Sequence, residues 1–314
     1  MSTPVHVALA TPEAHEEVIA LAAARLSHMT RAEVSFPFES PEVFTHLVVA
    51  VARDDDGRLL GMGLSLRPTF APPDRSMLRV VVARDHEGRG VGSALRRFLL
   101  PHVPDATRRL GGGVYDDEPR SLEIVRHWGF GVEEHAIDSA LDFVAHPPEP
   151  PTVPSGVVLE EVPDLAFDDE DAVTAMLLAS QTNPEAAVGF VMTLEKFRAM
   201  TTSEESPICV VARVDGRPAG ISYGTVTAGE LFIAYSGIDP AVRGRGLMRL
   251  VKQQAHVAAA RAGARMARTN NEENNLGIRR INAELGYVVQ SGVYRLVKDV
   301  AATDRLPATD PRTP

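Results

Sequence analysis

The sequence predicts an α/β protein that contains two copies of one domain. Its 314 residues exceed the usual size of a single domain, and 44% apolar with 24% charged residues is ordinary globular composition. Two glycine-rich turns, each between an apolar strand and a helix, lie 156 residues apart, and a proline-rich segment lies between them. These three observations indicate two tandem domains of similar construction.

Short motifs recur in the same order in both halves, 155 to 160 residues apart. Such spacing indicates a unit that was duplicated once. Each half has a β-hairpin signal with an Asp-Gly turn, then a glycine-rich turn, then an aromatic or apolar residue followed by Gly. The first copies are Val51-Ala52-Arg53 with Asp56-Gly57, Gly88-Arg89-Gly90 and Trp128-Gly129-Phe130; the second copies are Val211-Ala212-Arg213 with Asp215-Gly216, Gly244-Arg245-Gly246 and Leu285-Gly286-Tyr287.

Each half is expected to run strand, helix, hairpin, apolar strand, helix, strand, short helix and closing strand. Thr11-Pro12-Glu13 is typical of a helix start, with Thr as the cap and Pro in the first turn. We expect strands at 5–10, 77–83, 111–115 and 132–143 in the first half and at 157–162, 231–238, 265–269 and 287–297 in the second. The helices that follow the glycine turns are expected at 91–100 and 247–262.

The proline-rich segment sets the predicted domain boundary. Five prolines between Pro147 and Pro154 remove backbone donors and favour an extended spacer. We therefore predict one domain at 1–146, a linker at 147–155 and a second domain at 156–302. The polar, non-periodic residues 303–314 are expected to form a disordered tail.

Composition and charge limit the compartment and the partners. We see neither a secretory signal nor an apolar stretch of membrane-spanning length, and the single cysteine, Cys209, lies in an apolar run. We therefore expect a cytoplasmic protein without a membrane partner. The net charge of −10 argues against a nucleic-acid partner, which would require a basic face. The ten histidines show no paired metal spacing, so no metal site is expected.

The glycine turns carry the strongest chemical signal. Glycines between a strand and a helix allow backbone N–H groups to surround a diphosphate at the positive end of the helix. Arg89 and Arg245 would add positive charge. The alternative is a tight structural turn at the helix start, and two such turns in matched contexts make that alternative weaker.

The second half resembles the GNAT superfamily of N-acetyltransferases. The resemblance is carried by a strand, Arg243-Gly244-Arg245-Gly246-Leu247, a long helix, a strand, and an Asn-rich segment before Ile281-Asn282-Ala283-Glu284-Leu285-Gly286-Tyr287. The duplicated architecture resembles the mycothiol synthase family. The resemblance implies two tandem GNAT domains, each with a mixed central sheet flanked by helices, and acetyl-CoA as cosubstrate.

The family's acetyl-CoA motif, Gln/Arg-x-x-Gly-x-Gly/Ala, maps onto both glycine turns with one departure in each. In the second half Met248 replaces the last small residue, and in the first half Glu87 replaces Gln/Arg. Glu87 would place a negative charge near a diphosphate. The resemblance implies these CoA-binding residues: Gly237, Ile238, Arg243, Gly244, Arg245, Gly246, Leu247, Met248 and Asn275 in the second half, and Val82, Gly88, Arg89, Gly90, Val91 and Gly92 in the first.

Asn275 belongs to a pattern frequent in one GNAT branch, in which this residue starts a helix beside the CoA arm. By resemblance it would bond the pantetheine; alternatively it only caps the helix, a role that suits asparagine. The first half has Glu118 at this place, so the CoA contacts of that half look degraded.

The catalytic acid and base are less defined. A tyrosine that protonates the CoA thiolate in many family members is replaced here by Asn282 and, in the first half, by Val125. Either Tyr235 or Tyr294 donates instead, or the thiolate leaves unaided. Glu230 is our first candidate for the base that the amine requires, with an exposed strand end as the alternative. The backbone N–H near Gly237 or Ile238 would stabilise the thioester oxygen.

These expectations add up to an N-acetyltransferase that transfers an acetyl group directly from acetyl-CoA to the amine of a small molecule, with the second domain favoured as the active one. Two alternatives stay open: catalysis in the first domain, and a non-catalytic CoA-binding or structural protein. The sequence identifies neither the acceptor nor the oligomeric state, which could be monomer or homodimer.

Overall fold

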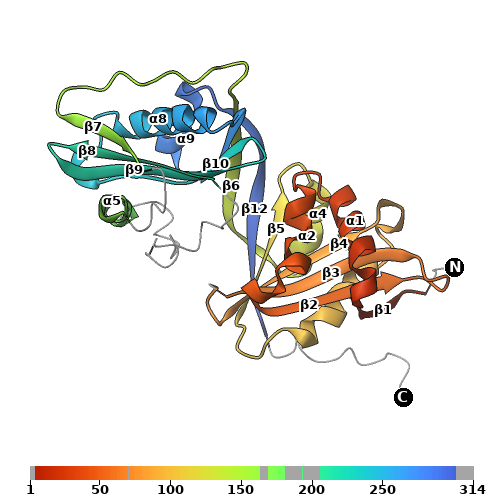
Figure 1. The fold of residues 1–314 in the computed structure, drawn as a ribbon. Helices are drawn as coiled ribbons and strands as arrows, with labels where there is room; N and C mark the ends of the chain where they lie inside the picture. The colour runs from red at the N-terminus through yellow and green to blue at the C-terminus, as the bar shows by residue number, and fades with distance from the viewer. Residues whose placement is uncertain (1–3, 70, 163–168, 181–192, 194–205, 302–314) are drawn as a thin grey trace. The chain divides into compact units, whose positions relative to one another are not determined.

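A computed structural model describes residues 4–69, 71–162, 169–180, 193 and 206–301. The chain forms two compact units (Figure 1). Unit 1 comprises Met1–Val114, Arg120–Glu133 and Arg295–Pro314, and unit 2 comprises Tyr115–Pro119 and Glu134–Tyr294. Each unit is a mixed sheet with helices, as the sequence predicts.

The sheet of unit 1 has the strand order β1-β2-β3-β4-β5. All neighbours are antiparallel except β4 and β5, which run parallel. The strands are β1 (His6–Leu9), β2 (Phe44–Arg53), β3 (Leu59–Pro68), β4 (Arg75–Val82) and β5 (Arg109–Tyr115). The helices are α1 (His15–Arg25), α2 (Arg31–Glu39), α3 (Val91–Leu99) and α4 (Pro119–His127), with 3₁₀ turns at Pro12–Ala14, Pro41–Val43, Arg84–His86 and Leu100–His102.

Alternation along β3 places α1 and α3 of unit 1 on opposite faces of its sheet. Val18 of α1 packs in one core with Met62 and Leu64. The intervening Gly61 and Gly63 lie under Leu95 and Leu99 of α3, where a Cβ on Gly63 would be 2.5 Å from Leu99 Cδ1. The period-two pattern of the hairpin thus produces a sheet that is covered on both sides.

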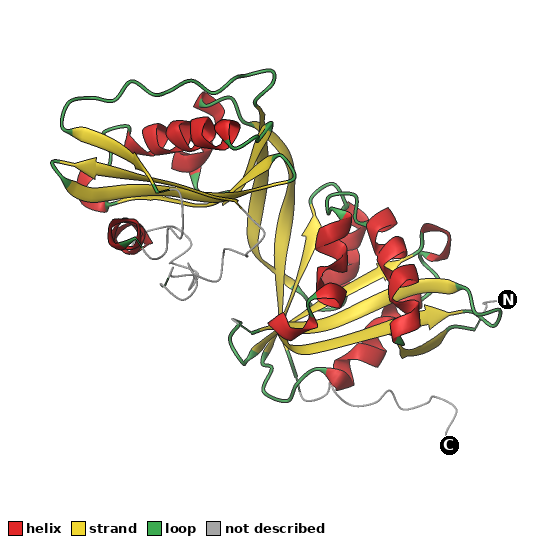
Figure 2. Cartoon of the chain, in the orientation of Figure 1, coloured by secondary structure: helices red, strands yellow, loops and turns green. Residues whose placement is uncertain are grey.

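Unit 2 repeats this construction with the strand order β6-β11-β10-β9-β8-β7. Its α5 packs on Cys209, Val211 and Tyr223, whereas Val210 and Ala212 belong to the core beneath α8. Helices α5 and α8 therefore lie on opposite faces of this sheet (Figures 1 and 2). The strands are β7 (Val157–Glu161), β8 (Ser206–Val214), β9 (Arg217–Thr227), β10 (Glu230–Ile238) and β11 (Met266–Glu272). The helices are α5 (Glu170–Ser180), α8 (Leu247–Arg261) and α9 (Leu276–Glu284), with a 3₁₀ turn, η6, at Pro240–Val242.

The closing strand of each sequence half is divided between the units. Residues 134–142 of β6 (Gly131–Asp142) belong to unit 2, where Ala136 lies opposite Glu272 of β11. The end of β12 (Val288–Asp299) belongs to unit 1, where the following Val300 donates its N–H to the Arg108 carbonyl at 2.8 Å. The compact units therefore differ from the halves 1–146 and 156–302 by an exchange of closing strands.

The secondary structure expected from the sequence agrees closely with the observed elements. Thr11 precedes a 3₁₀ turn with Pro12 in its first position, and α1 follows directly. β11 reaches Glu272, three residues beyond its expected end. The tail that we expected at 303–314 lies outside the described residues. No helix in the described part of the chain is both long enough and apolar enough to span a membrane.

Candidate functional site

The parallel strands β10 and β11 of unit 2 separate halfway along their length. They pair from Glu230–Met266 to Ile233–Thr269, but β10 continues to Ile238 and β11 to Glu272. The separation begins where β10 has a β-bulge between Ile233 and Tyr235, opposite β9. Beyond the bulge, alternate backbone groups of β10 face away from β9 and have no ladder partner in β11.

The open strand leads directly into the glycine loop. Asp239 caps η6 by accepting the Ala241 N–H at 2.9 Å. Gly244 and Gly246 then have φ values of 80° and 75°, the left-handed conformation that favours glycine, and α8 begins at Leu247. A Cβ on either glycine would meet no atom within 4 Å. Open space before consecutive backbone N–H groups at a helix start is the geometry of an anion site.

The side chains predicted to bind the cofactor in unit 2 gather at this loop. Arg243 Nε donates to the Ile238 carbonyl at 3.0 Å and thus ties the loop to the end of β10. Arg245 is exposed, Leu247 is buried, and Met248 packs partly buried against the core beneath α8. Met248 is therefore accommodated on the core side of the helix, which explains why a large residue is tolerated where the motif has a small one.

Unit 1 has a second loop of the same geometry. β4 pairs with β5 only from Arg75–Arg109 to Met77–Gly111 and continues to Val82. Gly88 and Gly90 have φ values of 71° and 85°, and α3 begins at Val91. The β3–β4 register is continuous, however, so β4 lacks the bulge of β10. Unit 1 shares the loop and the strand separation but not the distorted strand.

Glu87 does not place an uncompensated negative charge at the loop of unit 1. Its carboxylate accepts a hydrogen bond from Arg25 Nη2 at 2.6 Å and lies 3.5 Å from Arg120 Nη1. Arg25 ends α1, and Arg120 lies in the first turn of α4. Neither arginine was predicted as a site residue, because Arg25 and Arg120 lie 62 and 33 positions from Glu87 and no local motif connects them to it.

Asn275 is the N-cap of α9. Its Oδ1 accepts the Ile278 N–H at 3.4 Å, so the capping interpretation is confirmed. Its predicted contact with the CoA arm stays a prediction.

Asn282 forms a buried amide pair at the opening between the strands of unit 2. Its side chain is 2% exposed, and its Nδ2 donates to Asn271 Oδ1 at 2.7 Å. Asn271 lies on β11 beyond the last residue that pairs with β10. Asn282 Oδ1 is buried and has no hydrogen-bond partner among the described residues. An amide is not a proton donor of useful acidity, so this residue positions polar atoms rather than protonating a thiolate.

Tyr235 and Gly237 both lie on the open part of β10. Tyr235 is buried against α5, and its hydroxyl donates to the Met176 carbonyl at 3.4 Å. Gly237 lies so close to α5 that a Cβ there would be 2.4 Å from Ala179 Cβ and 2.9 Å from the Tyr235 hydroxyl. The backbone at 237 is therefore held between helix and ring. Tyr294 lies elsewhere, stacked on His135.

Glu230 lies at the paired end of β10. It is the first residue of β10, at the end where β10 and β11 are still paired, and Arg268 Nη1 lies 3.5 Å from its carboxylate. This position agrees with the alternative of a strand-end residue, and the role of Glu230 as the base stays a prediction.

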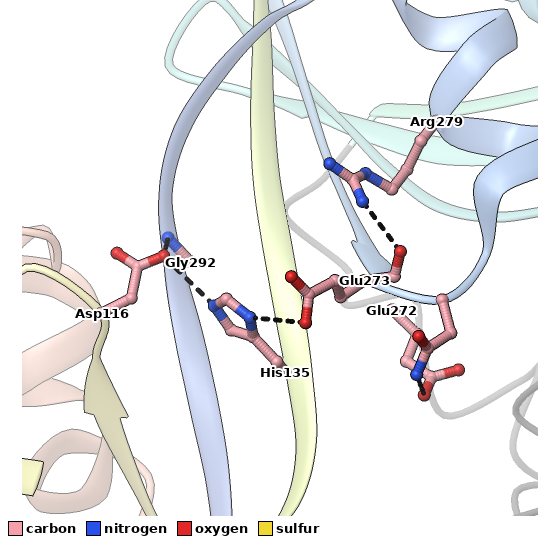
Figure 3. A network of polar contacts seen from close by, with 7 residues as sticks. Asp116, His135, Glu272, Glu273, Arg279 and Gly292 are labelled. Carbon is pink, nitrogen blue, oxygen red and sulfur yellow. Dashed lines mark hydrogen bonds and ion pairs between the residues drawn. The ribbon is translucent and has the colours of Figure 1, made fainter.

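A polar network in unit 2 joins residues from both sequence halves (Figure 3). His135 Nε2 lies 3.2 Å from Asp116 Oδ2, and Nδ1 lies 3.2 Å from Glu273 Oε2. The backbone N–H of Gly292 donates to the same Asp116 carboxylate oxygen at 2.8 Å. Arg279 Nη1 donates to the Glu273 carbonyl at 2.8 Å. The network thus fixes the segment that leads from β11 to Asn275.

The thiol of Cys209 is buried, which disfavours its thiolate form. Burial, with a smaller contribution from the charge of Asp169, raises the pKa of its thiol to about 12. A thiol of that pKa is protonated at neutral pH and lacks the reactive thiolate form. Among the described residues, no group of three or more His, Cys, Asp or Glu side chains could hold a metal ion.

Comparisons with known proteins agree with this geometry. Residues 18–130 match the model of the acetyltransferase (GNAT) family. No curated protein matches the chain. The match falls in the first half, whereas the motif resemblance is stronger in the second.

Solved structures resemble the chain over almost its entire length. A GCN5-related N-acetyltransferase from Sphaerobacter thermophilus superposes with a TM-score of 0.72 at 17% identity, covering 94% of this chain and 95% of that one. A tandem GNAT protein from the clavulanic acid biosynthesis pathway has a TM-score of 0.69 at 20% identity, covering 94% and 98%. At these identities the likeness shows the fold alone. Residues 18–130 thus match the acetyltransferase (GNAT) family model, and the chain as a whole has a tandem GNAT fold.

Proposed function

We propose that this protein is an N-acyltransferase that uses acetyl-CoA and transfers the acetyl group to the amine of a small molecule, with the reaction in unit 2. One observation carries the choice of unit: β10 has a bulge at the point where it separates from β11, and the same strand ends in the Arg243–Gly246 loop. β4 of unit 1 runs into its loop without a bulge. Bulges occur preferentially beside active sites, where they release backbone groups from the ladder.

Residues of unit 2 would bind the cosubstrate and stabilise the transition state. The N–H groups of the Gly244–Gly246 loop and the start of α8 would hold the diphosphate. A backbone N–H on the open part of β10, near Gly237 or Ile238, would stabilise negative charge on the thioester oxygen. The amine nitrogen would attack the thioester carbon, the C–S bond would break, and the proton lost by the amine would pass to a base or to water.

The leaving thiolate needs no acid from Asn282. A thiol of ordinary pKa, near 8.5, is a tolerable leaving group at neutral pH. The high pKa of Cys209 argues against an acylated enzyme, so direct transfer is the mechanism that the residues support.

The first test is a calorimetric titration of the full-length protein with acetyl-CoA, followed by a panel of amines with release of free thiol as the readout. Binding and turnover with at least one amine would support the proposal. Absence of acetyl-CoA binding would contradict the proposed function, and only the similarity of fold would stand. Binding without turnover across a broad panel would favour a non-catalytic CoA-binding protein.

A second candidate places catalysis in unit 1, and the family match at residues 18–130 favours it. Gly90→Ala and Gly246→Ala distinguish the two units. The substitutions are matched, because both glycines have φ near 80° and an added Cβ would meet no atom within 4 Å in either case. Each imposes only the backbone strain of a left-handed alanine, about 1–2 kcal/mol. We expect Gly246→Ala to reduce turnover and Gly90→Ala to leave turnover unchanged. The reverse result would assign the active site to unit 1.

A further inference from the structure

The two glycine loops are equivalent residue by residue, but one pair of positions carries opposite charges. Val82 and Ile238 end their strands 156 residues apart, and Glu87 and Arg243 are separated by the same interval. The loops between them contain a 3₁₀ turn in both units, at Arg84–His86 and Pro240–Val242. A carboxylate cannot make the hydrogen bond that the guanidinium of Arg243 donates.

In unit 2 that hydrogen bond joins the loop to the strand. Arg243 Nε donates to the carbonyl of Ile238 at 3.0 Å. The last carbonyl of the open strand is thus satisfied, and the loop is held in the form that presents its glycines.

In unit 1 the same contact comes from a different helix. Arg25, the last residue of α1, donates from Nε to the carbonyl of Val82 at 3.0 Å. Its Nη2 donates to Glu87 at 2.6 Å, and its side chain is only 16% exposed. The planar fork of one arginine therefore bridges the strand end and the residue that replaces the loop arginine.

The charge at the loop is restored as well. Arg120 lies 3.5 Å from the other oxygen of Glu87 and 3.1 Å from the place that a Cβ on Gly88 would occupy. Two guanidinium groups and one carboxylate leave one net positive charge, the same as Arg243 alone. Arg120 is 63% exposed, so its side chain is accessible to a ligand at the Gly88–Gly90 loop.

We infer that Arg25 is a positioning residue that, through Glu87, replaces the missing loop arginine, and that unit 1 has thereby kept a working site for the diphosphate of a CoA molecule. The inference rests on the proposed use of acetyl-CoA by this protein. It predicts two CoA sites per chain. It also predicts that the site in unit 1 depends on a residue outside the loop motif.

The test is calorimetric titration of the full-length protein with coenzyme A. The wild type is expected to bind two molecules. Arg25→Ala should weaken one site at least tenfold, and Arg243→Ala should weaken the other. Arg31→Ala is the control, since it removes the same charge from an exposed arginine of unit 1 that pairs only with Glu16 among the described contacts.

A rescue variant separates positioning from general stability. The double substitution Arg25→Ala/Glu87→Arg returns the guanidinium to the position that it has in unit 2, and it should restore the second site. Arg25→Lys keeps the charge but lacks the fork, so it should restore binding only in part. Thermal melts verify that each variant is folded; should Arg25→Ala not fold, Arg25→Lys and Glu87→Gln give the same comparison.

The outcomes distinguish this inference from the proposed function. Two sites of unchanged affinity in Arg25→Ala would overturn the inference, as would failure of the folded double variant to regain the site. A single wild-type site that is lost in Arg243→Ala but kept in Arg25→Ala would overturn it while the proposed function stands. Absence of any CoA binding by the wild type would overturn both.

Discussion

A Cβ atom on Gly292 would lie 2.6 Å from Nε2 of His135. The two residues occupy equivalent positions in the closing strands, 157 residues apart. Asp116 and Glu273, the two carboxylates that face the His135 ring, directly follow β5 and β11 and are also 157 residues apart. The backbone contacts are paired too: Asp116 N–H donates to the Gly292 carbonyl at 2.9 Å, and Glu273 N–H donates to the His135 carbonyl at 2.8 Å. The ring of His135 thus contacts the carboxylates that follow the equivalent strands of both halves. The equivalent position in the second closing strand, Gly292, has no space for a side chain.

The first prediction concerns this glycine. Gly292→Ala should lower the free energy of unfolding by about 1–3 kcal/mol, the usual cost of overpacking, because the new methyl would also be 2.7 Å from the Ala136 carbonyl oxygen and from Asp116 Oδ2. Chemical denaturation measures the change. Gly277→Ala in α9 is the control: nothing lies within 4 Å of its added Cβ, so we expect a gain of up to about 1 kcal/mol. Equal effects of the two substitutions would contradict the packing argument.

The second prediction separates the hydrogen bonds of His135 from its stacking. The ring is 4.1 Å from the ring of Tyr294 between centroids, with an interplanar angle of 21°. His135→Phe keeps an aromatic ring but removes both contacts to carboxylates, so it should cost about 1–3 kcal/mol. His135→Ala removes the stacking in addition and should cost more. A His135→Phe variant with the same free energy of unfolding as the wild type would mean that the carboxylate contacts contribute nothing to stability.

The order of elements follows from local signals that the sequence contains. Asp-Gly turns, apolar strands and the left-handed glycines at 90 and 246 specify short-range structure, and the structure has each of them where it was expected. The glycine loops were predicted for the same reason, since backbone conformation and glycine are linked directly.

Long-range pairing could not be predicted in this way. The alternation in 132–143 identifies a strand but not its neighbour, so the pairing of β6 with β11 was missed. The contact between Arg25 and Glu87 joins residues 62 positions apart in a chain with many other arginines. A strand pattern also does not show at which end two parallel strands separate, so the position of Glu230 at the paired end could not be predicted.

The third prediction uses the buried Lys252 of α8. Burial lowers the pKa of this side chain from 10.5 to about 7, even though its Nζ lies 5.2 Å from the centre of the Tyr287 ring. The unfolded chain therefore binds more protons than the folded protein between pH 7 and about 10.5, so stability should rise with pH across this window, by about 5 kcal/mol at most. Burial also lowers the pKa of His256 to about 3, so stability should fall as the pH drops from about 6.5 toward 3.

Two substitutions at Lys252 test this assignment. Lys252→Met removes the group that must lose its proton or be buried charged, so it should stabilise the protein at pH 7 and flatten the rise above pH 7. Lys252→Arg should destabilise it strongly, because a guanidinium stays charged. Thermal melts from pH 5 to 10 give both readouts. A wild-type melting temperature that is constant between pH 7 and 10 would contradict the lowered pKa.

The last prediction joins packing to the proposed chemistry at Gly237. The equivalent position in unit 1, 156 residues earlier, is Val81, so a side chain is compatible with this strand position when the facing helix leaves room. In unit 2 the Cβ of Ala179 occupies that room, 2.4 Å from the place of a Cβ on Gly237. Gly237→Ala should therefore move the open part of β10 away from α5 and reduce both stability and acetyl transfer. Ala179→Gly alone should cost about 1 kcal/mol of helix stability and leave β10 in place.

Combining the two substitutions gives the decisive comparison. The double variant Gly237→Ala/Ala179→Gly removes the contact between the new methyl group and Ala179 Cβ. The losses in free energy of unfolding and in transition-state stabilisation should therefore each be about 1–2 kcal/mol smaller than the sum of the two single effects. The double-mutant cycle is measured by denaturation and, separately, by kcat/KM. Strict additivity in stability would mean that the contact with α5 does not hold β10. Coupling in stability without coupling in kcat/KM would mean that the position of Gly237 is irrelevant to the reaction, and the opening beside β10 would lose its assignment as the site of the thioester.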